Sequence, residues 1–111
     1  MSYQPYEAPG EPGASRVESG PWQVAVEYSN QGDAKPPTIV QVGSSVFARR
    51  EQALAAARQT AFEYAPPDPW SPQGRRVWGD GPDGFLVVIE GATTTFHMSV
   101  RVVQYLGEVA D

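Results

Sequence analysis

The residue best suited to acid–base chemistry in this sequence is His97, the single histidine, in the segment Thr-Thr-Phe-His-Met-Ser. Ser99 follows two residues later, and a serine nucleophile needs a base such as histidine within reach. In an extended strand, however, residues i and i+2 project in parallel from the same face, so these two side chains do not converge. We therefore interpret His97 as an ordinary surface histidine, and we expect that the protein is not an enzyme.

Metal and phosphate chemistry finds equally little support. The sequence holds no cysteine, which excludes thiolate metal sites and cysteine nucleophiles. Asp80 and Asp83 lie in Gly-Asp-Gly-Pro-Asp-Gly, but an EF-hand calcium loop is longer and ends on a glutamate, so a plain hairpin turn is the better interpretation. The same segment lacks the Lys-Ser/Thr ending of a phosphate-binding loop. We expect no metal and no cofactor.

Arginines and tryptophans are the residues that could bind nucleic acid, because phosphates attract the first and bases stack on the second. The formal net charge of −5 opposes this attraction, so dispersed surface arginines are the competing interpretation. Nucleic-acid binding is therefore the weaker alternative, and it requires the two arginine pairs to share one surface. The residues concerned are Arg49, Arg50, Arg58, Arg75, Arg76, Arg101, Trp70 and Trp78.

One long helix is predicted over residues 49–65, a segment rich in alanine. Leu54, Ala57, Ala61 and Tyr64 recur at helical spacing and form an apolar stripe. The two prolines that follow cannot continue the helix. Its small side chains would let the helix lie close to a sheet.

The predicted start of the helix is unusual. No good capping box is visible there, and Arg49 and Arg50 lie in the first turn, where they oppose the helix dipole. Either the helix begins slightly earlier or these two arginines meet acidic partners.

Five strands are predicted from apolar residues that alternate with polar ones. They cover residues 22–29, 38–47, 75–78, 85–90 and 93–106, and the last has Phe96, Met98, Val100 and Val102 on one face. The order strand, strand, helix, strand, strand, strand predicts an α+β fold. We expect a two-layer sandwich, with one mainly antiparallel sheet of about four to five strands and a single helix on one face.

Such a sheet has a second face that the helix does not cover. The strand of residues 85–90 is apolar on both sides, so its residues Leu86 and Val88 would lie on the open face in a polar surrounding. Our leading hypothesis is a protein-interaction or assembly module that binds a protein partner or a second copy of itself. The candidate contact residues are Leu86, Val88, Thr95, His97, Arg101 and Trp70.

Trp70 lies in a connector with four prolines between residues 66 and 72, which predicts a stiff, extended segment. We favour a ring that folds back over the helix end or the sheet edge, and the alternative is an exposed recognition aromatic. A small-molecule pocket between the helix, Trp70 and Trp78 is an alternative function. The helix and arginines nearby would suit an acidic or aromatic ligand.

Residues 1–20 are rich in Pro, Gly, Ser and Glu, which predicts a disordered tail ahead of a single domain over residues 21–111. The longest apolar run, residues 85–89, is far too short for a membrane span, and the N-terminus has no basic-then-apolar signal pattern. We therefore expect a cytoplasmic protein with no membrane partner.

Two segments are familiar: Val-Phe-Ala-Arg-Arg-Glu-Gln-Ala-Leu-Ala-Ala-Ala from residue 46, and residues 64–78 with the Gly-Asp-Gly-Pro-Asp-Gly-Phe-Leu-Val-Val-Ile-Glu-Gly stretch that follows. Together they resemble small hypothetical proteins of actinobacteria over about residues 21–106. That group has no assigned activity, so the resemblance implies a bacterial cytoplasmic protein and no mechanism.

Overall fold

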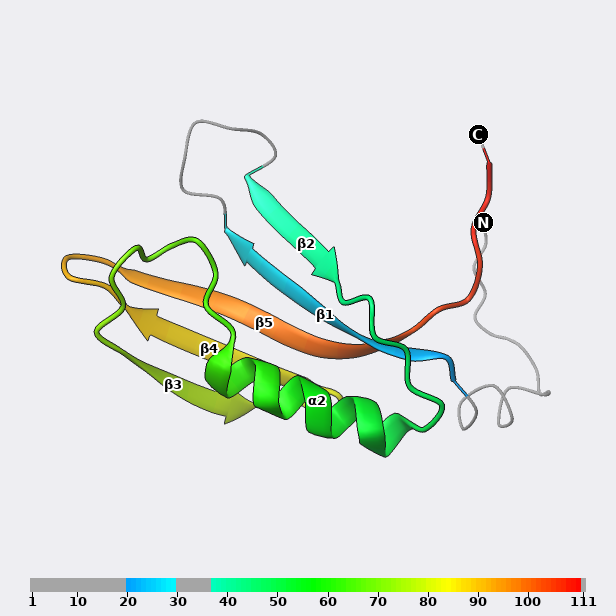
Figure 1. Cartoon of the computed structure of the whole chain (residues 1–111). Coiled ribbons are helices and arrows are strands. Elements are labelled where there is room, and N and C mark those ends of the chain that lie inside the picture. Colours follow the sequence, from blue (N-terminus) through cyan, green and yellow to red (C-terminus); the bar gives the residue numbers. More distant parts are fainter. Residues whose placement is uncertain (1–19, 30–36, 111) are drawn as a thin grey trace.

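The computed structural model describes residues 20–29 and 37–110 of the chain (Figure 1). The predicted order of elements and the α+β class are confirmed. The elements are β1 (Trp22–Ser29), β2 (Thr38–Val42), α2 (Arg50–Glu63), β3 (Gly74–Gly79), β4 (Gly84–Glu90) and β5 (Thr95–Gln104). The predicted tail, apart from Gly20, and most of the predicted loop between the first two strands lie outside the described residues.

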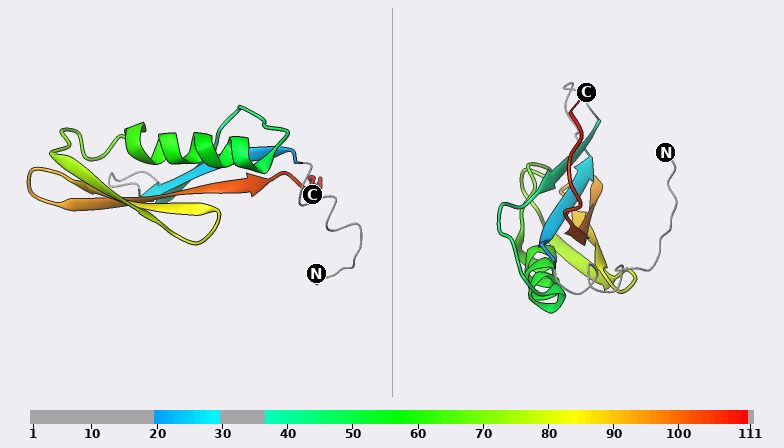
Figure 2. Two further views of the ribbon diagram at one scale, coloured as in Figure 1. Left: turned by 90° about the horizontal axis from the view of Figure 1, so that it is seen from below. Right: turned by 90° about the vertical axis from the view of Figure 1, so that its right-hand side faces the viewer.

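The five strands form one sheet in the order β2-β1-β5-β4-β3, and every neighbouring pair is antiparallel. β5 is the central strand and pairs with both β1 and β4. β4 is an interior strand, between β5 and β3, which fits its two apolar faces. Figure 2 shows α2 along one side of the sheet, with no described helix or strand over the other side.

The core lies between the sheet and α2. Alternate residues of β1, β5 and β4 point toward the helix and are buried, among them Val26, Met98 and Ile89. Met98 and Val100 have no exposed surface, which confirms the face predicted for the last strand. Because successive side chains of a strand alternate between faces, these positions form a continuous apolar layer.

α2 approaches the sheet through alanines. Ala53, Ala57 and Ala61 are spaced four residues apart and are completely buried. The prediction named Ala57 and Ala61 but missed Ala53, and it placed Leu54 and Tyr64 in the stripe, where the structure has them half-buried at its margins. With only a methyl group on each contact position, the helix axis can lie close to the strands beneath it.

The predicted second strand is too long at its end, because β2 stops at Val42. The chain then leaves the sheet and returns at Phe47, which forms an isolated antiparallel bridge with Trp22. The backbone N–H of each residue donates to the carbonyl of the other, over 2.9 Å and 2.8 Å. Residues 43–46 therefore form a short detour, a non-strand segment between β2 and the bridge at Phe47. The alternation of apolar and polar residues in the sequence does not reveal this interruption.

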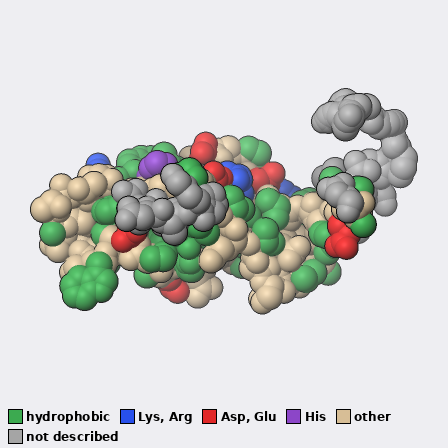
Figure 3. Space-filling model, turned by 90° about the horizontal axis from the view of Figure 1, so that it is seen from above, with side chains coloured by type: hydrophobic (Ala, Val, Ile, Leu, Met, Phe, Trp, Pro, Cys, Tyr) green, Lys and Arg blue, Asp and Glu red, His purple; other side chains and the backbone are tan. Residues whose placement is uncertain are grey.

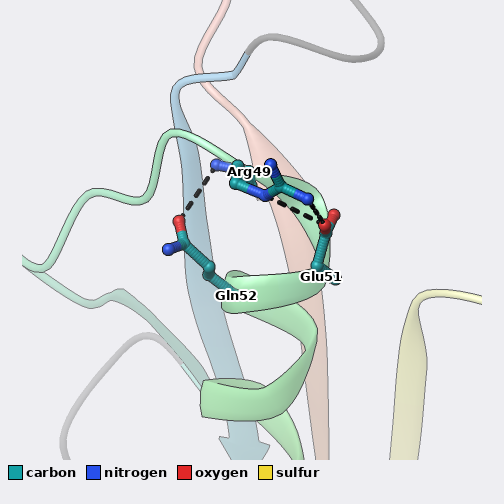
Figure 4. A network of polar contacts seen from close by, with 3 residues as sticks. All are labelled: Arg49, Glu51 and Gln52. Atoms are coloured by element: carbon teal, nitrogen blue, oxygen red, sulfur yellow. Dashed lines mark hydrogen bonds and ion pairs between the residues drawn. The ribbon is translucent and has the colours of Figure 1, made fainter.

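The start of α2 has half of a capping box, contrary to the prediction. Arg49 is the N-cap, and its backbone N–H donates to Oε1 of Gln52 over 3.3 Å (Figure 4). The Arg49 guanidinium binds Glu51, and this hydrogen bond lowers the pKa of the Glu51 carboxyl below its usual value. An acidic residue in the first turn also suits the helix dipole.

Arg50 meets an acidic partner as well. Its guanidinium binds the carboxylate of Asp83 and donates to the Pro82 carbonyl over 3.0 Å. The second of the two explanations offered for these arginines is therefore confirmed. The contact ties the first turn of α2 to the turn between β3 and β4.

Candidate binding surfaces

His97 and Ser99 lie side by side on β5, on the sheet face that points away from α2. Across the sheet, His97 is opposite Val88 and Ser99 is opposite Leu86. Their cross-strand neighbours on β4 are thus apolar, and neither supplies a group that could activate a nucleophile. Among the described residues, no group of three or more His, Asp or Glu side chains could hold a metal ion.

We call the sheet face away from α2 the outer face. The strand register brings five of the six predicted contact residues together on it: Leu86, Val88, Thr95, His97 and Arg101. On the β3 side, Trp78 is opposite Leu86 and Arg76 is opposite Val88. On the other side, Val40 of β2 is opposite Glu27 of β1.

The outer face combines apolar residues of β4, β3 and β2 with polar residues of the central strand β5, and it is partly exposed. Leu86 and Val88 are half-buried, whereas Trp78 and Val40 are 45% and 57% exposed. The Arg76 guanidinium lies over the Trp78 ring at 5.5 Å from its centroid, a cation–π contact. Figure 3, seen from above, shows the histidine near one border of the view, beside acidic and basic side chains, with hydrophobic side chains scattered among polar ones.

The charges on the outer face occur in opposite pairs. Arg101 donates to Glu27 over 2.9 Å, from β5 to β1. Arg76 donates to Glu90 over 3.4 Å, from β3 to β4. These four side chains carry no net charge together, although the whole chain carries −5.

Trp70, the sixth predicted contact residue, lies apart from the other five. Its ring is 92% exposed, so it covers neither the helix end nor the sheet edge, contrary to the interpretation we favoured. It borders a small pocket of about 250 Å³ that also contains Pro69, Gly91 and Phe96. Residues 91–94, the turn between β4 and β5, also line this pocket, so it lies at that end of the sheet.

The structure does not bring Trp70 and Trp78 into one pocket. Trp70 precedes β3, whereas Trp78 is near the end of that strand and on the outer face. A strand that rises about 3.3 Å per residue therefore separates Trp78 from the segment that holds Trp70, before the start of β3. Trp70 lines the small pocket and Trp78 does not, so this geometry gives no support to the pocket predicted between the helix and both tryptophans, which stays a prediction.

The two arginine pairs do not share a surface. Arg49 and Arg50 lie at the start of α2 and bind carboxylates. Arg75 points to the helix side, where it donates to the carbonyl oxygens of Ala61 and Tyr64, while Arg76 is on the outer face. The described arginines thus form no basic patch, and the prediction of nucleic-acid binding gains no support from their placement.

A larger pocket lies between α2 and the β1–β2 side of the sheet, and sequence reasoning missed it. Its volume is about 550 Å³. Val24 and Val26 of β1 line it together with Phe47, Ala56 and the 41–45 segment. The pocket exists because α2 packs mainly on β5, β1, β4 and β3. The helix therefore does not cover the side of β2 that faces it.

Tyr64 and Gln41 bridge this pocket from its two sides. The phenol Oη of Tyr64, at the end of α2, donates to Oε1 of Gln41 on β2 over 3.2 Å. Partial burial, together with the nearby Tyr28, raises the pKa of the Tyr64 phenol above its usual value. The phenol is therefore uncharged near neutral pH. The one sequence signal for this site is Gln41, a polar residue at a helix-facing position of a strand.

Comparison with known proteins adds no relative: no protein-family model, curated protein or solved structure matches the chain. The resemblance to small actinobacterial proteins and the cytoplasmic location therefore stay predictions. Within the described residues, no helix has the length and apolarity that crossing a membrane requires.

Proposed function

We propose that this domain is a non-enzymatic assembly module whose outer face pairs with the outer face of a second copy. One observation carries the proposal: Leu86 and Val88 of the interior strand β4 lie on the outer face, between β5 and the edge strand β3, and no described layer covers that face. Apolar side chains gathered on an open face are typical of an interaction surface.

The charges of the outer face favour a second copy over a highly charged partner. Each of the pairs Arg101–Glu27 and Arg76–Glu90 is neutral, because it joins one positive and one negative side chain. Two outer faces can therefore approach without the repulsion expected between two chains of net charge −5. In a twofold dimer the same patch meets itself, so each neutral pair faces an equally neutral patch of the other copy.

The size of the face predicts a weak dimer. Five strands at a spacing of about 4.8 Å and about seven residues of rise give a footprint of roughly 550 Å² per copy. Stable complexes bury about 800 Å² per partner. We therefore expect association that depends on concentration, with two sheets stacked about 10 Å apart.

Light scattering over a concentration series tests this proposal. The expected result is a mass that rises from monomer toward dimer, and Leu86→Lys should keep the chain monomeric because a buried charge would lack a partner. Ala55→Lys adds the same charge at an exposed position of α2 and should leave the dimer intact. A strict monomer at the highest concentration, or a dimer insensitive to Leu86→Lys, overturns the proposal.

A further variant separates this dimer from an assembly that uses the proline-rich connector. Trp70→Ala removes the 92% exposed ring without touching the outer face. If the dimer uses the outer face, its mass profile should match that of the original chain. A dimer lost in Trp70→Ala and retained in Leu86→Lys would instead assign the contact to the connector.

A further inference from the structure

We propose that the pocket between α2 and β2 is a binding site for a small uncharged molecule, mainly apolar and with one hydrogen-bonding group. The pocket is on the helix side of the sheet, so this proposal is independent of the dimer proposed for the outer face. The proposal rests on the size of the pocket, on the absence of charge in its described lining, and on the placement of its polar groups.

The size and apolar surface of the pocket suit a small molecule. Ligand sites commonly have volumes of about 300–1,000 Å³ and are lined mainly by apolar side chains, with a few placed polar groups. This pocket has about 550 Å³, with Val24 and Val26 as its floor and Phe47 and Ala56 as walls. These apolar atoms could bury the hydrocarbon part of a ligand.

The described lining of the pocket determines the charge of the ligand. None of its described residues is a Lys, Arg, Asp, Glu or His. A carboxylate or ammonium group placed there would lose water without gaining an ionic partner, and that desolvation is strongly unfavourable. The structure thus selects against the acidic ligand that the sequence suggested for its tryptophan pocket.

The polar groups of the pocket can orient a ligand. The hydrogen bond from Tyr64 to Gln41 fixes both side chains and leaves the Gln41 amide nitrogen as a donor. Ser44 and Ser45 add hydroxyl groups along the same segment. Thr60 already donates to the Ala56 carbonyl over 2.8 Å, so it can offer a ligand only its lone pairs. A phenol or a primary alcohol is the kind of group that fits this set.

The test is a titration of the ¹⁵N-labelled full chain with 1-naphthol near neutral pH, followed by amide chemical shifts. A parallel titration uses 1-naphthoate, which has the same ring system and a negative charge. We expect shifts for 1-naphthol at residues 41–45, 60 and 64, and binding of 1-naphthoate at least about tenfold weaker. No shifts with 1-naphthol, or equal binding of both compounds, overturns the proposal.

Two neighbouring alanines give a matched pair of variants. Ala56→Phe fills the pocket and should weaken 1-naphthol binding at least about tenfold, whereas Ala55→Phe, on an exposed position of α2, should change it less than about twofold. Unchanged binding in a folded Ala56→Phe chain overturns the site. Should Ala56→Phe fail to fold, Gln41→Leu removes the polar wall at an exposed position, and unchanged binding of 1-naphthol in that variant overturns the proposed orienting role.

Leu86→Lys distinguishes this inference from the proposed function. It alters the outer face and should leave 1-naphthol binding unchanged while it abolishes the dimer. Loss of 1-naphthol binding in Leu86→Lys would place the bound compound at the outer face and overturn the assignment of the pocket.

Discussion

Arg75 of β3 donates a hydrogen bond from Nη1 to the carbonyl oxygen of Ala61 in α2, over 2.8 Å. Its Nη2 atom donates to the carbonyl of Tyr64, the C-cap, over the same distance. The last carbonyl groups of a helix have no partner within the helix, and the last turn of α2 contains no basic residue of its own. A guanidinium from the neighbouring strand thus satisfies these groups and complements the negative end of the helix dipole.

Arg75→Met should therefore lower the free energy of unfolding by about 2 kcal/mol, because two hydrogen bonds from a charged donor are lost at a half-buried position. Urea unfolding followed by circular dichroism measures this change. Arg76→Met is the matched control: its side chain makes an exposed ion pair with Glu90, and its loss should cost less than about 1 kcal/mol. Equal losses in the two variants would contradict the capping role.

The contact between Arg50 and Asp83 should contribute little to stability. Both side chains are partly exposed, 34% and 48%, so water screens their attraction. A double-mutant cycle with Arg50→Ala and Asp83→Ala should give a coupling energy of about 0.2–1 kcal/mol that shrinks in high salt. A coupling several times larger, or one insensitive to salt, would show that this contact does more than join the helix to the hairpin turn.

Tyr64 should make stability fall in alkaline solution. The pKa of its phenol is raised in the folded chain, chiefly by desolvation, from an ordinary value of 10.0. The folded state therefore holds the proton more tightly than the unfolded state, so this contribution is complete below about pH 10 and is lost as the pH rises through the folded pKa. Urea unfolding at about pH 8 and about pH 11 should show a smaller alkaline loss for Tyr64→Phe than for the original chain. Identical losses would exclude Tyr64 as the source.

Two glycines with positive φ should respond differently to alanine. Gly81 has a φ of +75° and no atom close to the place that a methyl group would occupy, so Gly81→Ala should cost only about 1 kcal/mol of backbone strain. Gly20 has a φ of +66°, and a Cβ there would lie 2.8 Å from Trp22 Cδ1 and 2.9 Å from the Phe47 carbonyl. Gly20→Ala should therefore cost about 2–4 kcal/mol in a thermal or urea unfolding experiment. Similar losses of stability in the two variants would mean that the backbone around Gly20 shifts easily to make room for the added methyl group.

The candidate surfaces differ in how far the sequence could predict them. Leu86, Val88, His97 and Arg101 were assigned to one face from alternation alone, and the register confirms that placement because a strand has a fixed period of two. Whether a partner binds there stays a prediction. The pocket between α2 and β2 could not be predicted, since it depends on which strands the helix covers, and that follows from packing across the whole sheet.

Local patterns were sufficient for the class of fold, the order of elements and the buried face of the last strand, because alternation and helical spacing are properties of neighbouring residues. Strand order, the detour before Phe47 and the separation of Trp70 from Trp78 were decided only by the tertiary structure. The tertiary structure also decided where the arginines lie, because the sequence allowed the two arginine pairs to form one basic patch. The packing instead sends Arg75 to the end of α2 and Arg76 to the outer face, because neighbouring residues of a strand point to opposite sides.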